Sequence, residues 1–485
     1  MAVTLYTSRI VLQVLGVEDF GIYNVVGGII SLFSFINGGM IAATQRYITF
    51  EIGHGDKDRL KKVFCTALQI HAIISLIIIF LGETVGLWFL YEKMVIPDDR
   101  MKAALWVYQC SIIACIINIM SVPYNADIIA HEKMSTFAYI SIAEVLLKLV
   151  IVYLLVIISW DKLVIYAILV VLVQLFVRSA YTLYCHKHFE ETIYYRIFDV
   201  KLFREMAAFA SWSFWGNLAG ILYTQGLNLM LNVFFGPTVN AARGIAVQVQ
   251  GAVQQFVSNF QMALNPQITK SYANDNFVTM YNLMFRSARF SFFLLFFIAL
   301  PILLDTNFLL KLWLKNVPDN AAVFTQIMIL ISLIYTAANP CVIVSQATGK
   351  VKVYQLVISS ILLTILPISY IFLKSGAPAY TVFIVHFCVE SIAQVARMCI
   401  LKRILNIPLN LFVKKVYMPI FLVVITSILI PLCVYHFYNE GWVRFILLVF
   451  SSIISVGCSV FMLGLTIEEK SFIVFKINQI FSTKR

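Results

Sequence analysis

A row of amide side chains runs along one predicted helix of an otherwise apolar chain. Between positions 241 and 265, polar residues recur every three or four positions, which places them on one face of an α-helix. They are Gln250, Gln254, Ser258, Gln261 and Asn265, widened by Gln248, Gln255 and Asn259, with Arg243 near the helix start. So many amides favour a water-filled lumen that binds sugar hydroxyls, while the alternative is hydrogen bonding between helices.

The preceding predicted helix, 207–235, carries a second polar set. Its members are Ser211, Trp212, Ser213, Trp215, Asn217, Thr224, Gln225, Asn228 and Asn232. Indole rings offer flat apolar faces with one hydrogen-bond donor, and amides offer directional hydrogen bonds, so the combination suits a sugar chain. We therefore expect Trp212, Trp215 and Asn217 to contribute to the same lumen.

Charged residues inside apolar segments are a second source of chemistry, because an unpaired charge in lipid is costly. Glu144 and Lys148 stand four apart on one helix and can neutralise each other. Glu390 shares a helix face with His386 and Arg397. That face predicts either a proton or cation relay or a buried network that holds two helices together.

The sequence contains no motif that indicates an enzyme. The chain contains no HExxH, GxSxG or P-loop motif and no paired DxD on a loop. The longest loops predicted outside the membrane, 87–103 and 305–320, are short for an enzyme that must hold a donor and an acceptor. His186 and His188 lack a third ligand nearby, so no metal site and no cofactor are predicted.

The amino-acid composition indicates the environment in which these residues fold. Of 485 residues, 61% are hydrophobic and 12% are charged, with a mean hydropathy of +0.89. Soluble domains carry about 45–50% apolar and about 25% charged residues. The chain therefore belongs in a lipid bilayer, as an all-α integral membrane protein.

Fourteen apolar segments are long enough to be membrane spans, because about 20 helical residues cross a bilayer. The shortest, 290–304, is flanked by Arg286 and Arg289. The predicted spans are 1–16, 21–48, 63–87, 104–126, 137–158, 163–183, 207–235, 241–265, 290–304, 321–345, 353–373, 378–401, 416–435 and 442–465.

The net charge of +12 reports topology rather than nucleic-acid binding, because the basic residues lie in short loops without a basic cluster. With the N-terminus inside, 25 of the 36 Lys and Arg residues fall on the cytoplasmic side, 9 on the opposite side and two within spans. This excess predicts a multi-pass protein with both termini in the cytoplasm.

The chain also resembles itself. An offset of 217 residues superposes Pro123 on Pro340, Lys133 on Lys350 and Tyr153 on Tyr370. The offset covers six spans, an even number, so the halves are parallel repeats, a design known among transporters. The predicted division is a six-helix lobe over 1–184, a linker over 185–206 that lies as a helix in the cytoplasmic interface, a second six-helix lobe over 207–402, and a helix pair with a cytoplasmic tail over 403–485.

Two motifs resemble a known family. They are SRIVLQVLGVEDFGIYNVVGG at 8–28 and VPYNADIIAHEKM at 122–134. Both are similar to segments of the polysaccharide-transport branch of the MOP exporter superfamily, which contains the lipopolysaccharide and capsule flippases. The resemblance covers essentially the whole chain. It implies two six-helix lobes in a V, as in MATE transporters, an extra helix pair, and alternating access driven by an ion gradient.

The resemblance also implies a substrate and a site. Such flippases turn undecaprenyl-pyrophosphate-linked oligosaccharides across the bacterial inner membrane, and cationic groups of the amino-terminal lobe hold the pyrophosphate. Arg9, within the first motif, is the position that matches this role, with Arg46 as a second candidate. Arg9 has no partner within its own span, so the alternatives are snorkelling or pairing with an acid elsewhere.

The chain departs from the family pattern at two points. Members carry a basic stretch before the position of Met1, so the first span is expected to be clipped. Asp127 stands where a small residue is expected, and it is predicted either to pair with Arg9 or to bind a coupling cation. Glu390 is the candidate for ion coupling in the second lobe.

Two other functions remain open. A cation-coupled multidrug antiporter of the same superfamily would need acidic residues in an aromatic pocket, and a membrane glycan polymerase would show activity on a sugar substrate. The expected partners are the lipid-linked oligosaccharide, membrane lipids, and a glycan polymerase and glycosyltransferases of the same pathway. The sugar, the coupling ion and the oligomeric state are not encoded in any motif.

Overall fold

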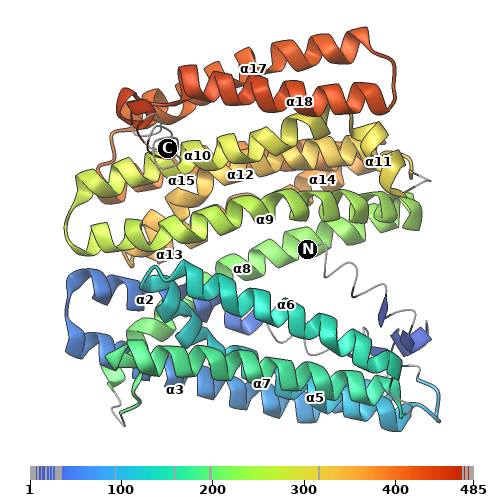
Figure 1. Ribbon diagram of the computed structural model, residues 1–485, viewed down its shortest axis with the longest axis vertical. Coiled ribbons are helices and arrows are strands. Elements are labelled where there is room, and N and C mark those ends of the chain that lie inside the picture. The colour runs from blue at the N-terminus through green and yellow to red at the C-terminus, as the bar shows by residue number, and fades with distance from the viewer. Residues whose placement is uncertain are drawn as a thin grey trace. The chain divides into compact units, whose positions relative to one another are not determined.

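The structure is a computed structural model that describes residues 35–92, 94, 96–157, 160–195, 199–314 and 317–471, together with Thr7, a few positions between 10 and 27, and positions 475 and 479. Within these residues the regular elements are all helices, and no strand is present (Figure 1). The fold class predicted from the sequence is confirmed.

Helices make up most of the described chain. They are α2 (Phe35–His54), α3 (Lys57–Leu81), α4 (Leu87–Glu92), α5 (Met101–Ala130), α6 (Met134–Ile157), α7 (Lys162–His188), α8 (Val200–Phe235), α9 (Pro237–Ala273), α10 (Phe277–Leu304), α11 (Thr306–Leu314), α12 (Ala321–Ala347), α13 (Val351–Leu363), α14 (Ile365–Lys374), α15 (Thr381–Leu405), α16 (Leu409–Phe412), α17 (Met418–Phe437) and α18 (Trp442–Ser459).

Eleven helical segments among the described residues are long and apolar enough to cross a membrane. They correspond to eleven of the fourteen predicted spans. Predicted span 1–16 and the first part of span 21–48 lie largely outside the described residues. Helix α9 is 37 residues long but does not reach the same hydropathy, because its amides replace apolar side chains.

Two sequence predictions about local structure were wrong. The predicted span 290–304 begins earlier, at Phe277, where the Asn276 side chain accepts a hydrogen bond from Thr279 N at 3.1 Å and caps the helix. The linker after α7 does not form an interfacial helix in its described part. It has one 3₁₀ turn, Glu190–Thr192, because Phe189 adopts an extended conformation in which its ring stacks on His131 at 4.1 Å.

The chain folds into two compact units. Unit 1 comprises Met1–Leu218 and Thr269–Asp275, and unit 2 comprises Ala219–Ile268 and Asn276–Arg485. Each unit is described by itself below.

The same packing recurs in both units. In unit 1, α5 packs against α3 and α7, and α6 packs against α7. In unit 2, α12 packs against α10 and α15, and α13 and α14 pack against α15. The matching helices α5 and α12 begin about 220 residues apart, as expected for parallel repeats, and contain Pro123 and Pro340.

The last two long helices, α17 and α18, pack against each other and against α10 (Figure 1). A buried ion pair fixes them, because Arg444 Nη2 donates to Asp305 Oδ1 at 2.6 Å across the α10–α11 junction. Arg289 within α10 binds Glu469, beyond α18, at 2.6 Å. The arginines that shorten the apolar window around 290–304 are thus neutralised by a partner far along the chain.

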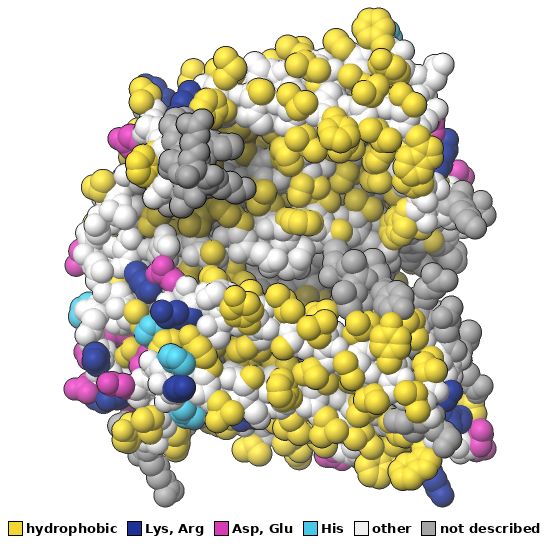
Figure 2. Space-filling model, in the orientation of Figure 1, with side chains coloured by type: hydrophobic (Ala, Val, Ile, Leu, Met, Phe, Trp, Pro, Cys, Tyr) yellow, Lys and Arg dark blue, Asp and Glu magenta, His cyan; other side chains and the backbone are white. Residues whose placement is uncertain are grey.

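Large apolar side chains are exposed along the spans. Leu76 and Phe80 of α3, Tyr139 of α6, and Leu183 of α7 are more than half exposed in unit 1. Figure 2 shows hydrophobic side chains covering the middle of the helices, with charged side chains gathered near helix ends. This distribution is that of a multi-pass membrane protein, in which lipid covers the apolar surface.

Candidate functional site

The predicted amide stripe of α9 turns partly toward α12 within unit 2. Gln250 Nε2 donates to Ser332 Oγ at 2.8 Å, and Gln261 Nε2 donates to the Thr336 carbonyl at 3.0 Å. Gln261 is only 2% exposed. These two amides therefore tie α9 to α12, the arrangement of interhelical hydrogen bonding. Their role in substrate binding stays a prediction.

A different side of α9 is exposed. We call the exposed side chains of Gln248, Gln255, Ser258 and Asn259 the exposed amide face. Gln255 donates to Asn259 Oδ1 at 3.1 Å, and Ser258 donates to the Gln254 carbonyl at 3.1 Å, so these bonds stay within α9. Gly244 and Gly251, also exposed, leave room for a ligand because a Cβ at either position would meet nothing within 4 Å.

Gln254 and Asn265 lie between these two sides of α9 and are half-buried. Gln254 Oε1 is buried without a hydrogen-bond partner among the described residues. An unmet acceptor of this kind is costly unless water or a ligand supplies a donor. Among the described residues, Gln254 is thus a member of the predicted stripe with an acceptor that remains open.

Arg243, near the start of α9, forms hydrogen bonds with polar groups of α8. Its Nη1 donates to Asn228 Oδ1 at 3.1 Å, and its Nη2 donates to the Thr224 carbonyl at 2.9 Å. Arg243 is 9% exposed, and its Nε has no partner in the part of the chain that the structure describes. No carboxylate is bonded to this guanidinium among those residues, so its charge is available to an anionic group.

Arg46 and the aromatic residues predicted in unit 1 lie on α2 and α8. The guanidinium of Arg46 lies over the rings of Tyr47, Phe50 and Phe209 at 4.5, 4.8 and 5.9 Å. The two helices cross closely at Gly39, where a Cβ would lie 2.5 Å from the Ala210 carbonyl. This crossing places Arg46 beside Phe209.

The remaining predicted residues of this unit lie on α8 or outside the described residues. Trp212 is half-buried, and Trp215 and Asn217 are exposed. Arg9, the position matched to pyrophosphate binding, lies outside the described residues, so its role stays a prediction.

Glu390 forms a buried ion pair in unit 2. Arg397 Nη1 donates to Glu390 Oε1 at 2.7 Å, and both side chains are less than 5% exposed. His386 packs against Tyr223 with ring centroids 5.3 Å apart. The geometry is that of the buried network considered from the sequence, and coupling to an ion stays a prediction.

The predicted pair within α6 is present. Lys148 Nζ donates to Glu144 Oε1 at 2.6 Å, as their spacing of four residues requires. This prediction is confirmed.

Asp127 belongs to a cluster at one end of unit 1. Its carboxylate, His131 and Glu191 place their ligand atoms within 4.8 Å of one another. Asp127 and His131 lie one turn apart at the end of α5, a spacing visible in the sequence, whereas Glu191 comes from the linker 60 residues later and gave no signal. His186 and His188 do not converge, because His186 Nδ1 contacts Thr192 Oγ1 and His188 Nδ1 contacts the Tyr184 carbonyl.

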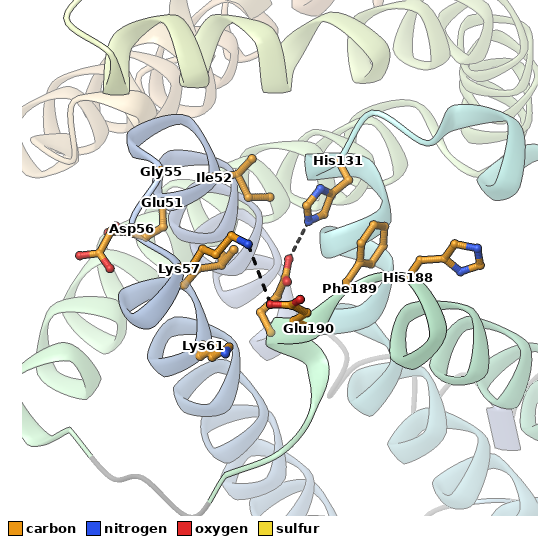
Figure 3. Close-up of a pocket in the computed structure, with 12 residues that line it drawn as sticks. Glu51, Ile52, Gly55, Asp56, Lys57, Lys61, His131, His188, Phe189 and Glu190 are labelled. Atoms are coloured by element: carbon orange, nitrogen blue, oxygen red, sulfur yellow. Dashed lines mark hydrogen bonds and ion pairs between the residues drawn. The ribbon is translucent and has the colours of Figure 1, made fainter.

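A cavity of about 340 Å³ opens beside this cluster (Figure 3). Its lining includes Glu51, Asp56, Glu190 and Glu191 against Lys57 and Lys61, together with His131 and His188. Lys57 pairs with Glu190 at 3.9 Å. Burial raises the pKa of Glu191, but the hydrogen bonds from His131 and from a backbone N–H, together with the charges of His131 and Lys57, outweigh it and hold that pKa below its usual range. Carboxylates outnumber lysines here, so the cavity favours cations.

Solved structures of similar fold are transporters. A mutant of a MATE transporter has a TM-score of 0.71 at 14% identity, over 82% of this chain and 91% of that chain. An outward-facing multidrug resistance MATE transporter of the MOP superfamily has a TM-score of 0.69 at 14% identity, over 81% and 89%. A MOP superfamily transporter from Pyrococcus furiosus Vc1 has a TM-score of 0.65 at 14% identity, over 82% and 90%. These likenesses show the MATE-like fold.

No curated protein matches the chain at a significant level. A family profile described as polysaccharide biosynthesis protein matches residues 4–272, which is more than half of the chain. The matched region contains both motifs that suggested the resemblance. The chain therefore belongs to the polysaccharide biosynthesis protein family, the polysaccharide branch of the MOP superfamily.

Proposed function

We propose that this membrane exporter is a flippase that translocates an undecaprenyl-pyrophosphate-linked oligosaccharide by alternating access. The matching family profile is described as polysaccharide biosynthesis protein, and the fold is that of transporters. The observation that carries the proposal is the exposed amide face of α9. Exposed amides inside a bilayer require water or a polar ligand, because lipid tails offer no hydrogen bonds.

The exposed amide face suits a glycan better than a drug cation. Amides donate and accept, as sugar hydroxyls do, and Gln225 and Asn232 of α8 are exposed as well. Helix α9 contains no Asp or Glu over its 37 residues, so it offers no counter-charge for a drug cation. This composition favours the flippase over the multidrug antiporter.

The lipid-linked substrate also carries a pyrophosphate, which needs positive charge. Arg243 offers a guanidinium held by neutral oxygens, and Arg46 offers one held over aromatic rings. A guanidinium matches phosphate oxygens through two parallel hydrogen bonds. We assign these two arginines, with Arg9, to anion binding, and Glu390 to coupling with an ion gradient.

The proposed setting follows from the substrate. A lipid-linked repeat unit is built by glycosyltransferases and consumed by a polymerase, so these enzymes are the expected partners. The site of action is the bacterial plasma membrane, with both termini in the cytoplasm as the distribution of Lys and Arg predicts.

The test is a flipping assay in proteoliposomes that contain an undecaprenyl-pyrophosphate-linked oligosaccharide and the purified full-length chain. We expect substrate to become accessible to an impermeant sugar-modifying enzyme only when wild-type protein is present. The double variant Gln255→Leu and Asn259→Leu should lose most of this activity and remain folded, because both side chains are exposed.

A matched variant separates binding from structure. Gln250→Leu removes an amide of the same helix that bonds to Ser332, so it should lower thermal stability while each folded molecule retains most of its transport. Full flipping by the Gln255 and Asn259 double variant would overturn the exposed amide face as the glycan site. Efflux of cationic drugs without flipping would favour the multidrug antiporter instead.

A further inference from the structure

Asp127 is a buried carboxylate with an unmet need for a partner. It is 0% exposed, and both of its oxygens lack a hydrogen bond among the described residues. Burying a polar group without a hydrogen-bond partner costs about 1–3 kcal/mol in proteins, and burying an unpaired charge costs more. A proton or a bound cation satisfies such a carboxyl.

The unmet oxygens of Asp127 face two further metal-ligand groups. His131 Nε2 lies 3.8 Å from Asp127 Oδ1 and 2.6 Å from Glu191 Oε1. Three side chains from α5, from the turn that follows it and from the linker thus converge on one point. One nitrogen and two carboxylates form a ligand set typical of divalent first-row metals.

We propose that Asp127, His131 and Glu191 form a binding site for a divalent transition-metal cation of the Zn²⁺ class. Zn²⁺ binds His nitrogen and carboxylate oxygen at about 2.0–2.2 Å, which keeps tetrahedral ligand atoms about 3.4 Å apart. His131 and Glu191, now 2.6 Å apart, must therefore separate, and Asp127, 3.8 Å from His131, must approach. The ion replaces the proton that lies between His131 Nε2 and Glu191 Oε1 in the metal-free protein.

The surroundings of the cluster support a metal site in two ways. The ring of His131 stacks on Phe189 at 4.1 Å with an interplanar angle of 8°, which orients the imidazole. The cavity gives an entry path and room for a water at the fourth coordination position (Figure 3). Mg²⁺ and Ca²⁺ prefer oxygen ligands only, so the nitrogen of His131 selects against them.

Within the cluster, the contact between His131 and Glu191 links the end of α5 to the segment that leads to α8. A bound ion would add Asp127 to this link. Asp127 lies in the last turn of α5, and Glu191 lies in the 3₁₀ turn of the segment that leads to α8. Occupancy would fasten this segment to α5. The site does not depend on the identity of the transported substrate.

The test is isothermal titration of full-length detergent-solubilised protein, stripped with chelator, with Zn²⁺, and separately with Mg²⁺. We expect one Zn²⁺ per chain, a higher melting temperature with Zn²⁺ because the ligand binds the folded state, and no such effect of Mg²⁺. Asp127→Asn, His131→Gln and Glu191→Gln should each weaken Zn²⁺ binding by at least about tenfold.

Glu190→Gln is the matched control, because it removes a carboxylate next to Glu191 in the same cavity but outside the three ligands. It should bind Zn²⁺ as the wild type does. Asp127→Asn keeps the shape of the side chain and removes only its ability to ionise, so it should fold about as well as the wild type without metal. No Zn²⁺ binding by the wild type, or equal binding by Asp127→Asn and the wild type, would overturn the proposal.

Discussion

The buried carboxylates of the two units differ at one residue, Asp127. The buried carboxylates of unit 2 meet a cation, and in unit 1 Glu51 likewise meets Arg59 at 3.0 Å, whereas Asp127 does not among the described residues. In unit 2, Glu390 meets Arg397 at 2.7 Å, Asp305 meets Arg444 at 2.6 Å, and Glu469 meets Arg289 at 2.6 Å. In unit 1, Asp127 is as deeply buried, yet no cation bonds to its carboxylate among the described residues, and its neighbour Glu191 is a second acid.

This difference separates structural charges from charges kept for a ligand. A buried charge that has an opposite partner at hydrogen-bond distance is neutralised and holds helices together. A buried charge without one destabilises the apo fold and is retained where it binds something. By this criterion the Asp305–Arg444 and Glu469–Arg289 pairs of unit 2 are clamps, the Glu390–Arg397 pair has the geometry of a clamp, and the Asp127 cluster is the proposed ligand site.

The largest expected effect tests a clamp of unit 2. Glu390→Gln leaves the buried guanidinium of Arg397 without its carboxylate, so the free energy of unfolding should fall by about 3–5 kcal/mol. Denaturation in mixed micelles of SDS and mild detergent measures the change. The double variant Glu390→Gln and Arg397→Leu should recover most of the stability.

The same double variant decides the role of Glu390 in coupling. If Glu390 only clamps helices, the rescued protein should transport at nearly the wild-type rate. A stable double variant that no longer responds to an ion gradient would show that Glu390 couples transport, and the comparison between the units would lose its clearest clamp.

The next largest effect should have the opposite sign. In the presence of chelator, Asp127→Leu replaces a buried polar group that has no hydrogen-bond partner among the described residues with an apolar group of the same branched shape, so the free energy of unfolding should rise by about 1–3 kcal/mol. The melting temperature of the metal-free protein measures this. A lower melting temperature would mean that Asp127 has a stabilising partner, and the contrast with Glu390 would fail.

Acid titration sharpens the comparison at Glu469, which lies beyond the last span. Burial raises the pKa of Glu469, but Thr466 N–H, Arg289 and Arg286 outweigh it and hold the pKa below its usual value. A carboxyl with a lowered folded pKa stabilises the fold above its unfolded pKa, and this contribution is lost as pH falls through the folded pKa.

The expected result is that the wild type loses its stability advantage over Glu469→Gln as the pH falls below the ordinary range of a glutamate, at about 1.4 kcal/mol for each tenfold difference in proton affinity between the unfolded and folded states. Melting temperatures of wild type and Glu469→Gln over a pH series provide the measurement. The two curves should converge in acid, and parallel curves would remove Glu469 from the clamps.

The smallest effect is expected for Glu144 and Lys148. Their side chains are 28% and 44% exposed, and they pair within one helix. Joint replacement by Gln and Met should change the free energy of unfolding by less than about 0.5 kcal/mol. A change as large as that of Glu390→Gln would show that exposure does not separate clamps from minor pairs in this protein.

Local sequence determined what depends on spacing along one helix. The apolar runs gave most of the spans, the i, i+4 spacing gave the Glu144–Lys148 pair, and the offset between Pro123 and Pro340 gave the repeat. It also placed Asp127 and His131 on one face. These inferences succeed because the period of the helix fixes the angle between residues on their own element.

Tertiary structure alone decided what lies opposite each face. It turned Gln250 and Gln261 toward α12 while Gln255 and Asn259 stayed exposed, brought Glu469 to Arg289 across 180 residues, and brought Glu191 to His131 across 60. Periodicity identifies a polar face but not its partner, because the rotation of a helix about its axis is set by packing against other helices. For this reason the sequence could indicate the class of protein, and only the fold could separate its clamps from its candidate sites.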